Sequence, residues 1–290
     1  MVFLNGQFLL LEDARIPVLD RGFIFGDAIY EFIPVYARAP FRIVEHFERL
    51  ERNLREARIR NPYTRIVWQQ HIEELISRQA FENQGVYLQV TRGVARRDHG
   101  FPAADVTPTV FMMANPLVNP APEVIENGVS AVTAEDFRWL RCDIKTTSLL
   151  ANCLLRQYAA EAGAAEAILL RDGKLTEASA SNVFLVKNGV ILGPPKSNLI
   201  LPGITYDVVV ELARGAGMPV ELRDLSAQEL RAADEIWLTS SSKEVVAVTK
   251  LDGIAVGGGH PGPLFRRMHS LYQQFKLELM RPGRTKAVPV

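Results

Sequence analysis

The sequence has few residues of the kinds that build disulfide frameworks or metal centres. Its two cysteines, Cys142 and Cys153, have neither the CxxC spacing of a redox or metal site nor enough companions for a set of disulfides. Its five histidines are scattered, without the i, i+4 pairing of a helical zinc site. We therefore expect reduced thiols and no metal centre.

An excess of charge and a long apolar run are also absent from the sequence. The 33 basic residues balance 33 acidic residues, so no global positive field would attract nucleic acid or an anionic membrane surface. No apolar run approaches a membrane span, and the first residues lack the basic and apolar regions of a signal peptide. We therefore expect a cytoplasmic protein that binds neither nucleic acid nor membranes.

The sequence does have enough apolar material for a large core. Hydrophobic residues make up 48% of the 290 residues, a length that suits two domains better than one. Residues 115–122 contain three prolines, which helix interiors and central strands do not accommodate, so this segment predicts an interdomain linker. The expected strands are grouped with helices rather than strictly alternating with them, which favours two α+β domains, at residues 1–114 and 123–290.

Local patterns predict several elements of the first domain. Asn5 and Gly6 suit a tight type I′ turn between two strands, because both residue types tolerate positive φ. Residues 29–36 and 41–44 are expected to form a second pair of strands. Over residues 45–58 apolar side chains recur with the spacing of one helix face.

Residues 257–262 match the GxGxxG pattern of dinucleotide-binding proteins. That pattern requires a complete βαβ unit and an acidic residue about 20 positions further on, whereas only one helix and a basic tail follow here. We therefore interpret this segment as a loop.

Lys145 lies in a segment with an apolar start, followed by three hydroxyl residues, Thr146, Thr147 and Ser148, that lead into an expected helix. A lysine in such a place is usually solvated, because a nucleophilic lysine needs a lowered pKa that a sequence does not reveal. The hydroxyl residues would then be helix caps. On this segment alone, catalysis by Lys145 is one of two open interpretations.

Two segments have the features of a phosphate site. Residues 201–205 open a strongly apolar helix, whose first N–H groups and Thr205 hydroxyl would lie at the positive end of the helix dipole. Residues 239–242 place four hydroxyl side chains after an expected strand. The alternatives are an ordinary N-cap at Thr205 and a polar turn at residues 239–242.

Arg97 and His99 occupy alternate positions after an expected strand, so both side chains can point to the same side of an extended segment. Two such donors would suit a carboxylate. A solvated basic loop is the other interpretation, and the local sequence favours it.

Taken together and in order, these segments resemble the fold-type IV pyridoxal-phosphate aminotransferases nearly end to end, and within them the enzymes that act on D-amino acids. The resemblance implies an α+β fold with a smaller N-terminal domain and a larger C-terminal, cofactor-binding domain that contains a barrel-like sheet. It also implies a homodimer with the cofactor between the two domains. The matching motifs are Asp20-Arg21-Gly22, Phe25-Gly26-Asp27, Tyr30-Glu31, Glu45-His46 with Arg49, Val90-Thr91-Arg92-Gly93, Arg97-x-His99-x-Phe101-Pro102, residues 138–145, Thr176-Glu177, residues 181–184, Leu201-x-Gly203-Ile204-Thr205 and Thr239-Ser240.

The resemblance implies roles for individual residues. Lys145 would hold the cofactor as a Schiff base and move a proton at the substrate Cα, and Glu177 would keep the pyridine nitrogen protonated. Tyr30, Arg97 and His99 would bind the substrate α-carboxylate, which decides which enantiomer turns its Cα–H toward the lysine. The cofactor-binding residues would be Arg49, Lys145, Glu177, Ser181, Leu201, Ile204, Thr205, Ser240 and Ser241.

The implied activity is transamination between a D-amino acid, such as D-alanine or D-glutamate, and a 2-oxo acid. Transaminases of branched-chain L-amino acids or (R)-amines, which generally lack the Arg-x-His pair, and aminodeoxychorismate lyases of the same fold are alternatives. A non-enzymatic cofactor-binding protein is another. Two positions depart from the family pattern: Arg96 adds a third arginine to the loop, which leaves the breadth of substrates open, and Ala180 stands where related enzymes often have serine.

Overall fold

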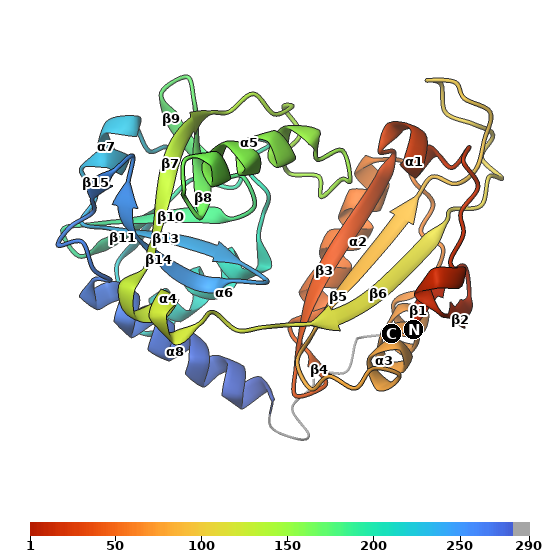
Figure 1. Cartoon of the computed structure of the whole chain (residues 1–290), viewed down its shortest axis with the longest axis horizontal. Helices are drawn as coiled ribbons and strands as arrows, with labels where there is room; N and C mark the ends of the chain where they lie inside the picture. Colours follow the sequence, from red (N-terminus) through yellow and green to blue (C-terminus); the bar gives the residue numbers. More distant parts are fainter. Residues whose placement is uncertain (281–290) are drawn as a thin grey trace. The chain divides into compact units, whose positions relative to one another are not determined.

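The computed structural model describes residues 1–280, which form two compact units (Figure 1). The first unit comprises Met1–Val118, Ile144–Ser148 and the described residues from Glu278 onward, and the second comprises Asn119–Asp143 and Leu149–Leu277. Residues 144–148, which contain Lys145, thus belong to the first unit although the chain has already entered the second. No helix within residues 1–280 is long and apolar enough to cross a membrane.

The first unit is built on a six-stranded antiparallel sheet with the strand order β2-β1-β6-β5-β3-β4. Strands β1 and β2 meet at the predicted turn, where Asn5 and Gly6 have φ of 49° and 89°, so this prediction is confirmed. The strands are β1 (Val2–Leu4), β2 (Gln7–Leu9), β3 (Ala28–Tyr36), β4 (Ala39–Pro40), β5 (Gln84–Thr91) and β6 (Val110–Pro116).

The partner of β3 at the sheet edge is β4, so the strand predicted at residues 41–44 is wrong. Arg42 adopts a left-handed backbone conformation with φ 52°, and Ile43 begins helix α2 (Ile43–Glu56). Phe41 and Ile43 are both buried, and this alternation imitates a strand over too few residues to distinguish it from a helix start. The helix predicted immediately afterwards is confirmed.

Helices α2 and α3 (Arg65–Ser77) pack on the sheet of the first unit and share one apolar core with it. Alternate residues of β5, namely Val86, Leu88 and Val90, are completely buried in this core, as the period of a strand requires. Trp68 of α3 fills the same core. A short helix, α1 (Arg21–Phe25), precedes β3, and a single 3-10 turn, η1 (Leu11–Asp13), follows β2.

The second unit contains a nine-stranded mixed sheet. Its strand order is β12-β11-β10-β13-β14-β7-β8-β9, and β15 pairs with β14 outside this row. The strands are β7 (Val129–Glu135), β8 (Glu166–Arg171), β9 (Lys174–Ala178), β10 (Asn182–Lys187), β11 (Val190–Gly193), β12 (Val220–Leu222), β13 (Glu235–Ser240), β14 (Glu244–Leu251) and β15 (Ile254–Ala255).

This sheet curls until two distant strands meet. Strands β9 and β10 stand at opposite ends of the row β10-β13-β14-β7-β8-β9, yet only three residues join them, and Ala178 N donates to Ser181 O at 2.7 Å. Ile168 of β8 faces the interior of the curl, whereas its neighbours Ala167 and Leu169 pack against α5. The sheet is therefore barrel-like, as the resemblance implies.

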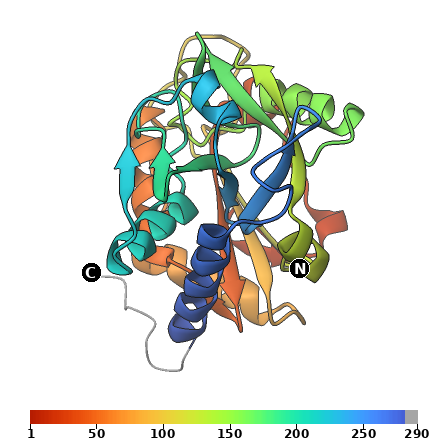
Figure 2. The same ribbon diagram turned by 90° about the vertical axis from the view of Figure 1, so that its left-hand side faces the viewer.

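Helices surround the curled sheet of the second unit. Helix α5 lies on a different side of the sheet from α6 and α8, as Figures 1 and 2 both show. These helices are α4 (Pro122–Asn127), α5 (Leu150–Glu161), α6 (Ile204–Gly215), α7 (Ala227–Arg231) and α8 (Pro263–Leu279).

Residues 257–262 form a loop between β15 and α8, as expected. The first N–H groups of α8 are already bound, since Leu264 N and Phe265 N donate to the Glu235 carboxylate at 3.0 and 2.8 Å. A dinucleotide phosphate would need these donors. The GxGxxG match is thus a coincidence of sequence.

Candidate active site

Lys145 lies where a short segment of the first unit runs beside the start of β3. Tyr30 N donates to Lys145 O at 2.9 Å, and the hydroxyls of Thr147 and Ser148 both donate to Gly26 O at 3.1 Å. These hydroxyls do not cap α5, which has no side-chain cap, so the helix-cap interpretation is wrong. The hydroxyl residues instead fix the backbone around the lysine to the first unit.

The Lys145 ammonium lies over the ring of Tyr30, with Nζ 4.1 Å from the ring centroid. Tyr30 in turn stacks on Tyr87, with ring centroids 5.5 Å apart. The negative face of an aromatic ring attracts a cation in this position. The structure thus brings together the predicted catalytic lysine and one of the predicted substrate-binding residues.

Arg49 is buried and bound to a buried carboxylate. Its Nε and Nη2 donate to the two oxygens of Glu31 at 2.8 and 2.7 Å, a bidentate geometry that fixes the plane of the guanidinium. Burial by itself would raise the pKa of Glu31, but Arg49 and His46 outweigh it and lower this pKa to about 2. The carboxylate is therefore charged at neutral pH and holds Arg49 in one orientation.

His46 completes this buried cluster. Its Nδ1 lies 2.8 Å from Glu31, and burial lowers the pKa of His46 although the carboxylate opposes this effect. The neutral ring then donates from Nδ1 to Glu31, which leaves Nε2 as an acceptor. Nε2 is buried and has no hydrogen-bond partner within residues 1–280. An acceptor of this kind fits a donor that a bound molecule or an ordered water would supply.

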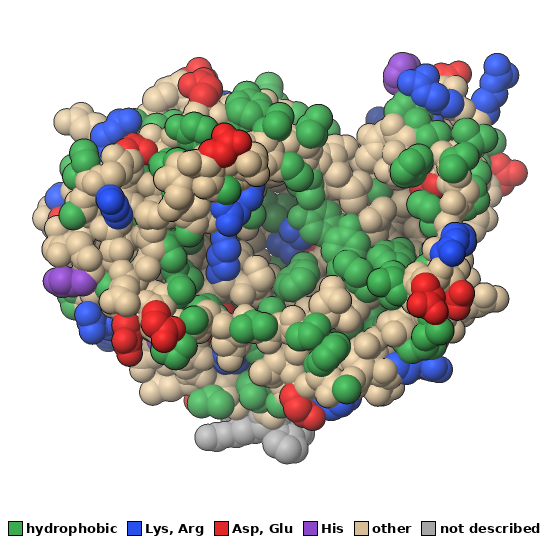
Figure 3. All heavy atoms as spheres, in the orientation of Figure 1, with side chains coloured by type: hydrophobic (Ala, Val, Ile, Leu, Met, Phe, Trp, Pro, Cys, Tyr) green, Lys and Arg blue, Asp and Glu red, His purple; other side chains and the backbone are tan. Residues whose placement is uncertain are grey.

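Arg97 and His99 lie on the exposed loop between β5 and β6. Both contact the ring of Phe25 in α1: the Arg97 guanidinium carbon lies 5.4 Å from its centroid, and the His99 ring centroid 5.5 Å away. Figure 3 shows Lys or Arg side chains and a histidine at this loop. The two side chains thus share one side, as their spacing predicts, but their contacts are with α1 rather than with Tyr30.

Glu177 of β9 is a buried carboxylate of the second unit that accepts three hydrogen bonds. One of its oxygens accepts a hydrogen bond from Arg138 at 2.5 Å, and the other accepts from Asn182 Nδ2 and Leu201 N, both at 3.0 Å. Burial raises the pKa of Glu177 to about 7, whereas Arg138 and the Leu201 N–H favour the charged form. Since all three partners are donors, the geometry suits a carboxylate that can face a further cation or N–H group.

The sequence does not reveal the role of Arg138, one of the three donors to Glu177. Its Nε and Nη2 donate to the two oxygens of Asp136, both at 2.9 Å, and Thr176 Oγ1 donates to the same carboxylate at 2.8 Å. The guanidinium is therefore shared between Asp136 and Glu177. No local pattern reveals this pairing, because Arg138 and Glu177 are 39 positions apart.

Helix α6 begins in the second unit beside Glu177. Its N-cap is Gly203, without a side-chain cap, so the alternative in which Thr205 is the N-cap is wrong. Asn182 Nδ2 also donates to Leu201 O at 2.8 Å, and a Cβ on Gly203 would clash with Asn182 Oδ1. Only glycine therefore fits this close approach. The first N–H groups of Ile204 and Thr205 lie at the positive end of a 12-residue helix.

The predicted hydroxyl residues of the second unit have different environments. Ser181 donates to a buried carboxylate, that of Glu166, at 3.0 Å. Ser240 Oγ accepts a hydrogen bond from Lys243 N at 3.1 Å. Thr239 Oγ1 is buried and has no hydrogen-bond partner within the described chain. Ser240 and Ser241 lie half-buried directly after it, at the end of β13.

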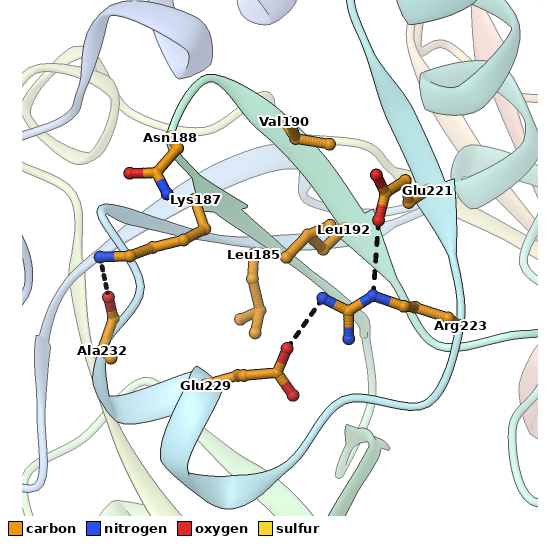
Figure 4. A pocket seen from close by; sticks show the side chains of 9 residues that line it. All are labelled: Leu185, Lys187, Asn188, Val190, Leu192, Glu221, Arg223, Glu229 and Ala232. Carbon is orange, nitrogen blue, oxygen red and sulfur yellow. Dashed lines mark hydrogen bonds and ion pairs between the residues drawn. The ribbon is translucent and has the colours of Figure 1, made fainter.

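The second unit also has a pocket of about 240 Å³ that none of the predicted site residues lines (Figure 4). Its charged groups satisfy one another: Lys187 donates to Ala232 O at 2.6 Å, and Arg223 pairs with Glu229 at 2.8 Å and with Glu221 at 3.4 Å. This pocket offers a ligand little unpaired charge.

Comparisons with known proteins agree on one family. The family described as Amino-transferase class IV matches residues 28–251. A D-alanine aminotransferase from Staphylococcus haemolyticus is 39% identical over 274 residues, which cover 94% of this chain and 97% of that protein. Its counterpart from Bacillus licheniformis is 40% identical over 272 residues, which cover 94% and 95%.

Solved structures extend this similarity to the fold. A branched-chain amino acid aminotransferase from Escherichia coli has a TM-score of 0.86 at 27% identity, covering 98% of this chain and 95% of that chain. A second branched-chain enzyme, from T.th. and solved with pyridoxamine 5'-phosphate, has a TM-score of 0.88 at 26% identity with the same coverage. The α+β fold-type IV architecture predicted from sequence is thus confirmed, and the chain belongs to the class IV aminotransferases.

Proposed function

We propose that this aminotransferase transfers amino groups between D-amino acids and 2-oxo acids, with pyridoxal 5'-phosphate as cofactor. The observation that carries the proposal is a difference in identity over nearly the whole chain. Relatives named D-alanine aminotransferase are 39% and 40% identical, whereas branched-chain aminotransferases of the same fold are 26% and 27% identical. Substrate specificity follows the residues around a shared cofactor site, so the higher identity favours D-amino acids.

The residues of both units fit such a cofactor. When bound, pyridoxal phosphate supplies an electron sink for the carbanion that remains after the substrate loses its Cα proton. The second unit has a helix N-terminus without a side-chain cap, the buried Glu177, and the hydroxyl of Thr239, which has no hydrogen-bond partner among residues 1–280. The first unit has Lys145, whose main chain is hydrogen-bonded to β3, and the buried guanidinium of Arg49. The lysine matches the carbonyl of the cofactor, and Glu177 matches its ring nitrogen. The guanidinium, the helix N-terminus and the hydroxyl match its phosphate.

In this proposal Lys145 and Glu177 carry the chemistry. Lys145 would be the residue that holds the cofactor, and its amine would also move the proton at the substrate Cα. Because Tyr30 fixes the main chain of Lys145, the amine reaches only a small volume. Glu177 would face the pyridine nitrogen and keep it protonated, and Arg138 favours the charged carboxylate that this role requires.

The phosphate would be held by charge and by N–H groups together. The guanidinium of Arg49 is oriented by Glu31, and the start of α6 presents backbone donors and a helix dipole. Hydroxyls at the end of β13 complete the donor set. The cofactor-binding residues of the proposal are Arg49, Lys145, Glu177, Ser181, Leu201, Ile204, Thr205, Ser240 and Ser241.

Tyr30, Arg97 and His99 bind the substrate α-carboxylate in this proposal. The contact of Tyr30 with Lys145 supports this role for Tyr30. Arg97 and His99 both contact the ring of Phe25, so their side chains lie on the same side of the loop and could act on one carboxylate. Fixing the carboxylate fixes which enantiomer presents its Cα–H to the lysine. The loop therefore accounts for a preference for D-amino acids over amines that lack a carboxylate.

A substrate panel tests this function. We expect D-alanine and 2-oxoglutarate to give pyruvate and D-glutamate, measured by chiral chromatography, and we expect (R)-1-phenylethylamine to react much more slowly because it lacks the carboxylate. Conversion of L-leucine in place of D-alanine would contradict the proposal. It would favour the second candidate, branched-chain L-amino acid transamination, which the similar solved structures support.

We also propose that the protein is a homodimer. Leu150, Leu154 and Tyr158 recur at every fourth position of α5, and their exposed fractions are 74%, 55% and 49%. A stripe of large apolar side chains on one helix face favours burial against another chain. Light scattering should therefore give twice the 32.3 kDa mass of one chain, and a concentration-independent monomer mass would refute the dimer. The cytoplasmic location expected from sequence stays a prediction.

A further inference from the structure

Glu166, at the start of β8, is a completely buried carboxylate to which the proposed function gives no role. Its oxygens accept hydrogen bonds from the hydroxyls of Ser179 and Ser181, the latter at 3.0 Å, and from the Lys243 ammonium at 2.9 Å. A buried charge is costly unless it is paired and hydrogen-bonded, so the loss of one of these partners would leave Glu166 poorly compensated. Glu166 thereby joins two other segments of the chain to the start of β8.

The first of these segments is the short connection between β9 and β10. It contains Ser179 and Ser181, and it joins Glu177 directly to Asn182, whose amide donates to Glu177 at 3.0 Å. Glu166 therefore anchors the connection between Glu177, which is proposed to face the pyridine nitrogen, and Asn182, which donates to Glu177.

The second segment leads from β13 to β14 and includes the four hydroxyl residues 239–242, which we call the hydroxyl turn. The main chain of Lys243 donates to Ser240 Oγ at 3.1 Å, while its ammonium reaches Glu166. At the other side of the turn, Glu244 has a left-handed backbone with φ 58°, and Lys276 and Gln273 of α8 each donate to its carboxylate at 2.6 Å. The hydroxyl turn is thus fixed from both sides before any ligand binds.

The hydroxyl turn contains one hydroxyl, Thr239 Oγ1, that is available to bind a ligand. The hydroxyl is buried, it lies next to Ser240, and it lacks a partner within residues 1–280. An unpaired buried hydroxyl is unfavourable unless a ligand or a water satisfies it.

We propose that Glu166 and Lys243 are positioning residues for the cofactor phosphate, which hold the hydroxyl turn at residues 239–242 in its binding conformation. The inference rests on the proposed function, because it assumes that this turn binds a phosphate. In this proposal neither residue is itself a cofactor ligand. Their effect reaches the cofactor through Ser240, on the phosphate side, and through Ser181.

Two substitutions test this role by measuring cofactor affinity rather than turnover. Glu166→Gln replaces the carboxylate by an uncharged group of similar shape, which removes the ion pair, and Lys243→Met removes the ammonium but keeps most of the side-chain length. We expect each to weaken binding of pyridoxal phosphate to the apoprotein by about tenfold, in an absorbance titration. Binding of pyridoxal, which has no phosphate, should change little. Lys174→Met is the matched control, because Lys174 forms an exposed pair with Asp224.

The double variant Glu166→Gln/Lys243→Met should bind no more weakly than either single variant, since the two residues act as one pair. Parental affinity in both single variants would overturn the inference and leave the proposed function intact. Equal losses for pyridoxal and pyridoxal phosphate would overturn it as well, because they indicate a general structural role. A parent protein that fails to bind pyridoxal phosphate would overturn the proposed function and this inference together. Thermal denaturation identifies a variant that fails to fold, and Lys243 is a third exposed, which makes Lys243→Met the milder change.

Discussion

Lys145→Ala is expected to abolish covalent binding of the cofactor and to slow transamination by about 10³-fold or more. Alanine removes the amine that both holds the cofactor and moves the proton. The main-chain bond from Tyr30 N to residue 145 remains, so the local fold should persist. Borohydride reduction followed by peptide mass spectrometry checks this result: in the parent protein the peptide that contains Lys145 should carry the cofactor mass.

Lys174→Ala is the control for this substitution, because Lys174 is a surface lysine whose ion pair is exposed. It should retain both the labelled Lys145 peptide and the parental rate. Labelling of a different lysine in the parent protein, or labelling that persists in Lys145→Ala, would show that the catalytic amine has been assigned to the wrong residue.

Glu177→Gln is expected to lower kcat by about 10²-fold, while the cofactor still binds covalently. Glutamine cannot supply the negative charge that keeps the pyridine nitrogen protonated, so the electron sink weakens. Arg138 stays paired with Asp136 through two hydrogen bonds, so the substitution does not leave an isolated buried charge. Single-turnover kinetics with D-alanine separate this loss from a change in substrate binding.

Glu177→Asp is the matched variant, because it keeps the charge but moves the carboxylate away from the nitrogen. We expect it to lose less activity than Glu177→Gln. A Glu177→Gln protein with the parental kcat would mean that another group protonates the ring, and it would remove Glu177 from the proposed mechanism.

The sequence predicts best those turns and helices that are determined by a few neighbouring residues. The Asn5-Gly6 turn and the helix after residue 45 were correct, because turn chemistry and helical spacing are local properties. The strand at residues 41–44 was wrong because a four-residue alternation fits a strand and a helix start equally well. Strand β14 was not predicted, although its run of valines is typical of a strand.

The active site could be predicted only through its motifs. Lys145, Glu177 and the start of α6 belong to segments that match a family in order. Their electrostatic partners do not appear in any local pattern: Arg49 and Glu31 are 18 positions apart, and Lys243 and Glu166 are 77 apart. Burial and tertiary packing decide which charges pair, and neither can be read from spacing. Thr147 and Ser148 illustrate the same limit, since the carbonyl that they bind is more than 120 positions away.

The half-reaction with D-alanine is the sharpest test of whether this protein takes amino groups from D-amino acids. The holoenzyme is mixed with D-alanine in the absence of any 2-oxo acid, and the pyruvate released is counted against the protein chains present. We expect one pyruvate per chain from D-alanine and none from L-alanine, with the amino group retained on the protein. Release of pyruvate from L-alanine alone, or none from either enantiomer, would contradict this expectation.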